Sequence, residues 1–143
     1  MIAHAGLIAR FDPPWWRGVL IEGPSGTGKS DLALRLLDQG WALVADDQCE
    51  LWASDGRVYG RAADTLKGLI EIRGLGIGPV VVRDLAPIAL VARCADPAEV
   101  ERMPDGETVN LLNQPLPLLK IAALHASAPM KLGHALTRLG LGR

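Results

Sequence analysis

The stretch GPSGTGKS has the glycine spacing of a loop that wraps around a phosphate chain. Glycines let the backbone N–H groups turn toward phosphate oxygens, and no side chain blocks the approach. In such a loop Lys29 reaches the β- and γ-phosphates and the Ser30 hydroxyl binds Mg²⁺. The sequence therefore predicts an ATP- and Mg²⁺-binding loop made of Gly23, Pro24, Ser25, Gly26, Thr27, Gly28, Lys29 and Ser30.

A pair of adjacent carboxylates, Asp46 and Asp47, follows 16 and 17 residues after Ser30. Such a pair after a strand most often caps a turn or a helix. Adjacent side chains of an extended backbone point in different directions, so one carboxylate can face a metal and the other an acceptor hydroxyl. With a phosphate loop expected beside them, we favour a catalytic or metal role for the two aspartates.

Glu71 and Arg73 form a second polar pair, in the string IEIRG. They are two positions apart, so they share one face of an extended segment. A surface ion pair would explain them. Because a glycine turn follows directly in a chain that also has a phosphate loop, we favour the edge of a site.

The elements around the loop can be read from apolar spacing. Residues 19–23 form a short apolar run ending in glycine, which predicts a buried strand that enters the loop. The helical spacing after Ser30 predicts a helix of about three turns, ended near Gly40. Residues 41–47 form a second strand, expected parallel to the first in one sheet after a right-handed crossover. Both strands should then end at the same edge of that sheet.

The rest of the chain predicts further strands and a helical end. Residues 69–85 place a glycine turn between two apolar stretches, and IALVARCADP reads as a strand ending at Pro97. The string NQPLPLL is expected to be an exposed loop. From Leu118 onward the helical spacing is interrupted by Pro129 and Gly133, which predicts two short helices.

Composition limits the class of protein. A chain of 143 residues predicts one domain, 1–143, and a net charge of -1 provides no basic field for nucleic acid. Cys49 and Cys94 lack the spacing of a zinc site or a disulfide scaffold, which favours the reducing cytoplasm. No apolar run is long enough to predict a membrane span.

Taken in order, HAGLIA, GPSGTGKS, LVADD, LIEIRGLGI and ERMPDGE resemble the catalytic domain of HPr kinase/phosphorylase, a family that phosphorylates a serine of the phosphocarrier HPr. The most specific string is EIRGLGI. The resemblance implies an α/β fold: a P-loop nucleotide-binding domain with a mixed or parallel central sheet and a PEP-carboxykinase-like catalytic core. It also implies an ATP-dependent serine kinase acting on an HPr-like carrier of the phosphotransferase system.

The resemblance implies roles only where residues match. Asp47 would accept the proton of the acceptor serine in the forward reaction and return it in the reverse one. Glu71 would be the second magnesium ligand, after Ser30. His4 matches a histidine on the strand before the loop, and Arg102 matches an arginine that manages charge on the transferring phosphoryl group. Supporting positions fall to Asp46 and Arg73.

The chain also departs from the family pattern. Full-length members have an additional N-terminal domain, and this chain starts at the catalytic one. The string RFDPPWWRG makes a longer hairpin than the family's turn. Its Trp15 and Trp16 suggest contact with a partner or another subunit, with packing onto the domain itself as the alternative. The family suggests a homo-oligomer, with a hexamer as its arrangement.

The family's Pro-Gly-Arg-Asn loop, associated with removing the phosphate, has no counterpart here, and NQPLPLLKIAAL stands in its place. We therefore expect kinase activity with weak phosphorolysis, unless Lys120 or His125 supplies the missing function. Two other functions stay open. A phosphate loop does not choose its acceptor, so a small-molecule kinase fits as well. A non-catalytic ATP-sensing module is the second alternative, although pure binding needs no base.

Overall fold

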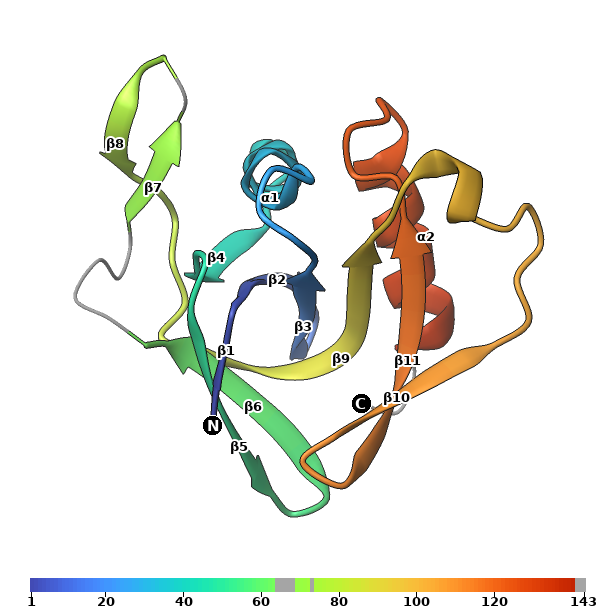
Figure 1. Cartoon of the computed structure of the whole chain (residues 1–143). Helices are drawn as coiled ribbons and strands as arrows, with labels where there is room; N and C mark the ends of the chain where they lie inside the picture. The colour runs from blue at the N-terminus through green and yellow to red at the C-terminus, as the bar shows by residue number, and fades with distance from the viewer. Residues whose placement is uncertain (64–68, 73, 141–143) are drawn as a thin grey trace.

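A computed structural model describes residues 1–63, 69–72 and 74–140 of the chain (Figure 1). Its strands are β1 (Ile2–Ala3), β2 (Ala5–Asp12), β3 (Trp15–Glu22), β4 (Ala42–Ala45), β5 (Cys49–Ser54), β6 (Arg57–Ala62), β7 (Leu69–Ile72), β8 (Gly76–Pro79), β9 (Leu85–Cys94), β10 (Glu107–Leu111) and β11 (Gln114–Ile121). Its helices are α1 (Lys29–Asp38), the 3-10 helix η1 (Pro97–Glu99) and α2 (Ala128–Leu139). The fold is α/β, with a mixed and strongly curled sheet.

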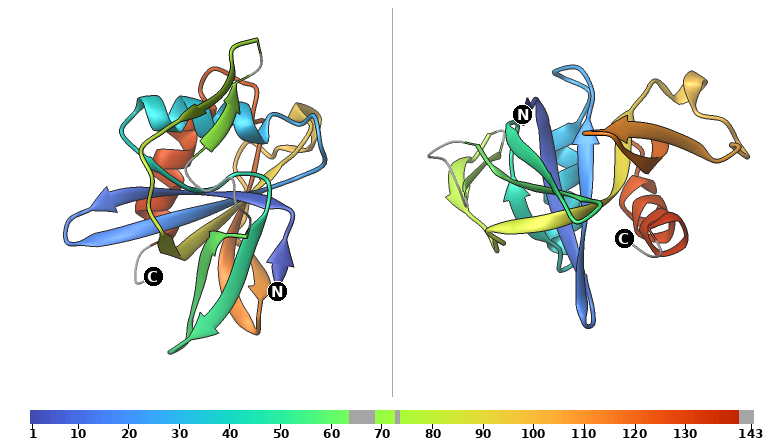
Figure 2. Two further views of the ribbon diagram at one scale, coloured as in Figure 1. Left: turned by 90° about the vertical axis from the view of Figure 1, so that its left-hand side faces the viewer. Right: turned by 90° about the horizontal axis from the view of Figure 1, so that it is seen from below.

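The sheet curls around strand β9, which pairs with different neighbours along its length. Its first residues pair antiparallel with β6, and its later residues lie parallel to both β3 and β11. The strand order runs β1-β5-β6-β9-β3-β2-β4, and the β10–β11 hairpin joins through β9. Figure 2 shows the β5–β6 and β10–β11 hairpins bending away from the central strands. The end of β3 that leads into α1 therefore lies beside the end of β9.

The central strands are buried on both faces, so their side chains alternate between two hydrophobic cores. On one face α1 and α2 cover residues such as Ile8, Val19 and Leu90. On the other face Leu7 and Leu20 pack with residues of the curled hairpins. This double burial fixes the position of β3, and with β3 the start of the loop that follows it.

The predicted strand, loop and helix around GPSGTGKS are present, because β3 ends at Glu22 and α1 begins at Lys29. The strand predicted at 41–47 is β4, and it runs in the same direction as β3. The two strands are not neighbours, however, since β2 lies between them and pairs antiparallel with both. The sequence patterns do not predict this place for β2, the first strand of the β2–β3 hairpin.

The prediction of two short C-terminal helices is wrong, because 128–139 form one continuous helix, α2. Pro129 lies in its first turn, where a backbone N–H has no helical partner to lose. Gly133 costs a helix only about 1 kcal/mol. Its carbonyl accepts a hydrogen bond from Arg10 Nη1 at 2.9 Å, which ties α2 to β2.

The exposed loop predicted at NQPLPLL is also wrong, because those residues form much of β11. Pro115 and Pro117 occupy alternate positions, so both missing N–H groups fall on the same edge of the strand. Pairing with β10 uses the other edge, and β11 pairs with β9 only from Leu118 onward.

The glycine turn predicted within 69–85 is confirmed as the β7–β8 hairpin, with positive φ at Gly74 and Gly76. The strand predicted before Pro97 is confirmed as β9. Across the described ranges, no helix is long and apolar enough to cross a lipid bilayer.

Candidate active site

The loop between β3 and α1 turns through left-handed backbone conformations. Gly26 and Gly28 have φ angles of 82° and 96°, which side chains with a Cβ rarely adopt. Gly28 caps α1, and no side chain makes a capping hydrogen bond there. The first N–H groups of α1 are therefore available to an anion, and the helix dipole favours negative charge at this end.

Side chains of the loop fold back on the loop itself. The Lys29 ammonium donates a hydrogen bond to the Gly23 carbonyl, and the Thr27 hydroxyl donates to the Pro24 carbonyl at 2.6 Å. Lys29 is half-buried, so its charge is held against the loop and does not extend into solvent. A cation in that position can attract phosphate oxygens wrapped by the loop.

Ser30 and Asp46 come together at the edge of the loop. The Ser30 hydroxyl donates to Asp46 Oδ1 at 3.1 Å, across the 16 residues that separate them in sequence. Asp46 follows directly after β4, whose end lies at the same edge of the sheet as the loop, as predicted. Hydroxyl and carboxylate oxygens are the donors that Mg²⁺ prefers, so this pair fits that ion.

Asp47 faces a different partner. Its carboxylate Oδ1 lies 3.3 Å from His4 Nε2, and the two side chains are 61% and 58% exposed. The divergence of the two aspartates was predicted from an extended backbone, but Asp47 has a left-handed φ of 72°. That turn directs Asp47 toward His4, while Asp46 faces Ser30. An exposed carboxylate beside an imidazole is positioned to accept a proton from an incoming hydroxyl.

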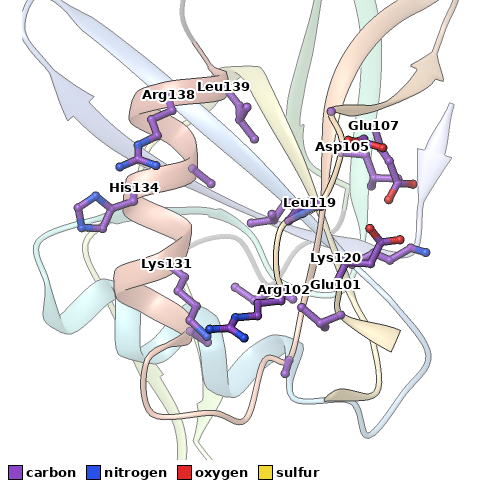
Figure 3. A pocket seen from close by; sticks show the side chains of 18 of the residues that line it. Glu101, Arg102, Asp105, Glu107, Leu119, Lys120, Lys131, His134, Arg138 and Leu139 are labelled. Atoms are coloured by element: carbon purple, nitrogen blue, oxygen red, sulfur yellow. The ribbon is translucent and has the colours of Figure 1, made fainter. Parts of the chain in front are cut away.

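Other predicted residues do not join this group. Arg102 follows η1 and lines an open groove of about 770 Å³ between α2 and the β10–β11 hairpin. Lys120 and His125 line the same groove. Figure 3 shows Arg102 and Lys131 extending toward one another across it. The groove is lined by none of the loop residues 23–30, nor by the aspartates that follow β4.

The predictions for Glu71 and Arg73 fall outside what the structure describes. Arg73 is not among the described residues, and for Glu71 the backbone of β7 is described without its side chain. Among the described side chains, no group of three or more His, Cys, Asp or Glu is arranged to hold a metal ion. The magnesium role of Glu71 therefore stays a prediction.

Two residues near the loop had no sequence signal that we recognised. Cys94 ends β9, and its Cβ would lie 3.0 Å from a Cβ added to Gly23. Burial raises the pKa of the Cys94 thiol, against a hydrogen bond with Thr27 and the charge of Lys29. The thiol therefore stays protonated, and it acts as a small apolar support under the loop. Leu124, far along the chain, packs against Gly28.

Comparisons with known proteins show the family to which the chain belongs. Residues 4–121 match the family described as the HPr Serine kinase C-terminal domain. The chain belongs to that family.

HPr kinase/phosphorylase of Streptococcus thermophilus is 46% identical over 81 residues, and that of Streptococcus pneumoniae is 44% identical over the same length. Each match covers 51% of this chain and 26% of the relative. The chain therefore matches about a quarter of the length of these curated relatives. A solved structure, the Hpr(Ser) kinase/phosphatase from Coxiella burnetii, matches with a TM-score of 0.79 and 25% identity. That match covers 96% of this chain and 94% of the other.

Proposed function

We propose that residues 1–143 form a single P-loop catalytic domain with a PEP-carboxykinase-like core, and that it transfers the γ-phosphoryl group of ATP to a serine of an HPr-like phosphocarrier. Family membership supports the class of reaction. The observation that carries the proposal is the Asp47–His4 pair at 3.3 Å, at the same strand end as the Ser30–Asp46 pair. The candidate proton acceptor, Asp47, thus directly follows Asp46, the carboxylate that pairs with Ser30 and suits Mg²⁺.

The chain's own residues divide the work of the transfer. Lys29 and the first N–H groups of α1 would hold the phosphate chain, and Ser30 with Asp46 would hold Mg²⁺. When bound, the ion neutralises charge on the phosphate oxygens. Asp47 accepts the serine proton as the serine oxygen bonds to the γ-phosphorus and the bond to the β-phosphate oxygen breaks. His4 orients Asp47, and ADP leaves with the electron pair of the broken bond.

The accessibility of the pair supports a protein acceptor over a small molecule. His4 and Asp47 are each more than half exposed, whereas a small-molecule kinase would enclose its acceptor in a pocket. A serine on the surface of a folded carrier can reach an open edge of this kind. The left-handed Asp47 also favours catalysis over simple ATP sensing, since a binding module has no need of a positioned base.

The proposal covers the forward direction in the cytoplasm, with phosphorolysis weak. Lys120 and His125, the candidates for replacing the family's phosphate-removing loop, line the groove together with Arg102. Assembly as a homo-oligomer, with the family's hexamer as its form, is part of the proposal. Arg102 would have to approach the phosphoryl group from its groove, and Arg73 would support the edge of the site.

The experiment incubates the protein with labelled ATP, Mg²⁺ and HPr-like carriers, and measures acid-stable phosphoserine. Asp47→Asn is expected to retain ATP binding and to lower transfer by roughly 10²- to 10⁴-fold, the usual effect of losing a positioned base. The matched control is Asp55→Asn, in the β5–β6 turn, where transfer should be unchanged. Wild-type transfer by Asp47→Asn would remove Asp47 as the base.

Two further results separate the proposed kinase from the alternative functions and test the reverse reaction. Phosphoserine formed on none of the carriers, with ATP still bound, would favour the sensing module or a small-molecule acceptor. Phosphorylated carrier incubated with Mg²⁺ and inorganic phosphate is expected to release little pyrophosphate. Release as fast as forward transfer would show that other residues replace the family's loop.

A further inference from the structure

Arg35 ties the loop helix α1 to a distant segment, residues 122–125, which follows β11. Its Nη1 donates to the His125 carbonyl at 2.9 Å and its Nη2 donates to the Ala123 carbonyl. The same guanidinium pairs with Asp31, one turn earlier on α1, at 2.9 Å. One planar side chain thus holds two carbonyl groups on either side of Leu124.

Backbone hydrogen bonds within and just after residues 122–125 also hold the segment in two turns. His125 N–H donates to the Ala122 carbonyl at 3.1 Å, and Ala128 N–H donates to the His125 carbonyl at 3.0 Å. These two turns and the Arg35 contacts leave the backbone around Leu124 with little freedom. The place from which the Leu124 side chain leaves the backbone is therefore set before any ligand binds.

That side chain lies over the phosphate loop. A Cβ added to Gly28 would be only 2.6 Å from Leu124 Cδ2, so the leucine occupies the space beside the last loop glycine. Leu124 is nevertheless 66% exposed. A leucine whose purpose was to fill space under the loop would be buried, as Leu32 and Leu36 of α1 are. Most of the Leu124 surface is instead presented to solvent at the rim of the loop.

We propose that Leu124 is the surface against which the nucleoside part of the bound nucleotide packs, and that Arg35 is the positioning residue that holds it there. The inference rests on the proposed nucleotide site. A phosphate chain wrapped by the loop brings its ribose and base to the rim, where their apolar faces can cover an exposed leucine. The loop thus recognises the phosphates, and a segment about a hundred residues later in sequence recognises the rest of the molecule.

The test compares ATP with tripolyphosphate, which has the same three phosphates and no nucleoside. Binding of each in the presence of Mg²⁺ is measured by calorimetry. Leu124→Ala is expected to weaken ATP binding about five- to tenfold through lost apolar contact, and to leave tripolyphosphate binding unchanged. Leu124→Met, which restores an apolar side chain of similar size, should recover ATP affinity.

Arg35→Lys tests the positioning role, because lysine keeps the charge but cannot span the two carbonyls. Its matched control is Arg10→Lys. Arg10 also donates to a helix carbonyl, that of Gly133, but it lies near the end of β2 that is away from the loop. Arg35→Lys should weaken ATP binding selectively, whereas Arg10→Lys should affect neither ligand.

Each remaining outcome is decisive. Equal losses for ATP and tripolyphosphate in Leu124→Ala would mean that Leu124 only shapes the loop, and would overturn the inference. Wild-type protein that binds tripolyphosphate as tightly as ATP would overturn it too, while leaving the phosphate loop intact. Wild-type protein that binds neither would refute the proposed nucleotide site itself, and the inference with it.

Discussion

The two ends of the β2–β3 hairpin differ sharply although the same two strands form both. At one end His4 precedes β2 and the glycine loop 23–28 follows β3, and both regions are polar and partly exposed. At the other end, the turn at Pro13 and Pro14, aromatic and arginine side chains pack on one another. The rings of Phe11 and Trp16 lie 5.1 Å apart, and the Arg83 guanidinium lies 4.5 Å from the Trp16 ring.

The difference shows how one hairpin can serve both stability and chemistry. At the turn, Arg10 bonds to both carboxylate oxygens of Asp12 at 2.7 and 2.8 Å and also reaches α2. These contacts fasten the hairpin to the rest of the domain. The loop end also has polar contacts, such as the Glu22–Arg93 pair at 2.7 Å and the His4–Asp47 pair at 3.3 Å, but these join side chains that stay partly exposed. Its glycines and left-handed Asp47 hold polar groups in place without burying them. A site of this kind depends on stability supplied elsewhere.

Lys29→Met should produce the largest loss of ATP binding. The substitution removes the cation held against the Gly23 carbonyl while keeping most of the side-chain volume. We expect ATP binding to weaken by roughly a hundredfold, because charge-assisted contacts to phosphate are lost. Stability should change by less than about 1 kcal/mol, since the side chain is only half-buried. Calorimetric titration with ATP measures the first and urea unfolding the second; unchanged affinity would exclude the loop as the phosphate site.

Trp16→Ala should produce the opposite pattern. Trp16 is half-buried and packs against the core on the hairpin face of the sheet, so we expect a loss of about 1–3 kcal/mol in the free energy of unfolding. ATP affinity and phosphoryl transfer should stay near wild type, measured at a temperature where the variant is folded. A selective loss of transfer at full stability would instead place the turn in the reaction.

Trp15→Ser should have the smallest effect on the isolated chain. Trp15 is 59% exposed, unlike its neighbour, so the unfolding free energy should change by less than about 0.5 kcal/mol. The sequence grouped both tryptophans as a contact for a partner, and Trp15 is the more exposed of the two. We expect Trp15→Ser to reduce carrier binding or self-association, measured by sedimentation. A destabilised variant with normal association would return Trp15 to a packing role.

Local sequence patterns were enough to predict the parts of the fold that depend on neighbouring residues. The spacing of Gly23, Gly26 and Gly28 predicted a turning glycine loop, whose phosphate binding stays a prediction, and the apolar pattern on either side predicted β3 and α1. The end of β4 at the same edge also followed, because strands of one direction end together. In each case the constraint is local: a backbone angle, a helical repeat or an alternating strand.

Local patterns failed where the chain's partners are distant. The prolines of β11 and the proline and glycine of α2 suggested breaks in these elements. The N–H groups that the prolines lack, however, fall where no backbone partner is needed. For β11 this depends on which strands lie on either side, and for α2 it depends on where the helix begins; a short stretch of sequence shows neither. The position of β2 between β3 and β4 was missed for the same reason, since strand order is a property of the whole sheet.

Tertiary structure alone decided how the candidate site is completed. His4 meets Asp47, Ser30 meets Asp46, and Leu124 covers Gly28, although these pairs are separated by 43, 16 and 96 residues of sequence. Folding also placed Arg102 on a groove that none of the loop residues 23–30 and neither Asp46 nor Asp47 lines. The physical reason is that hydrophobic burial of the central strands sets the order in which elements pack, and the polar side chains are carried to wherever their strands end.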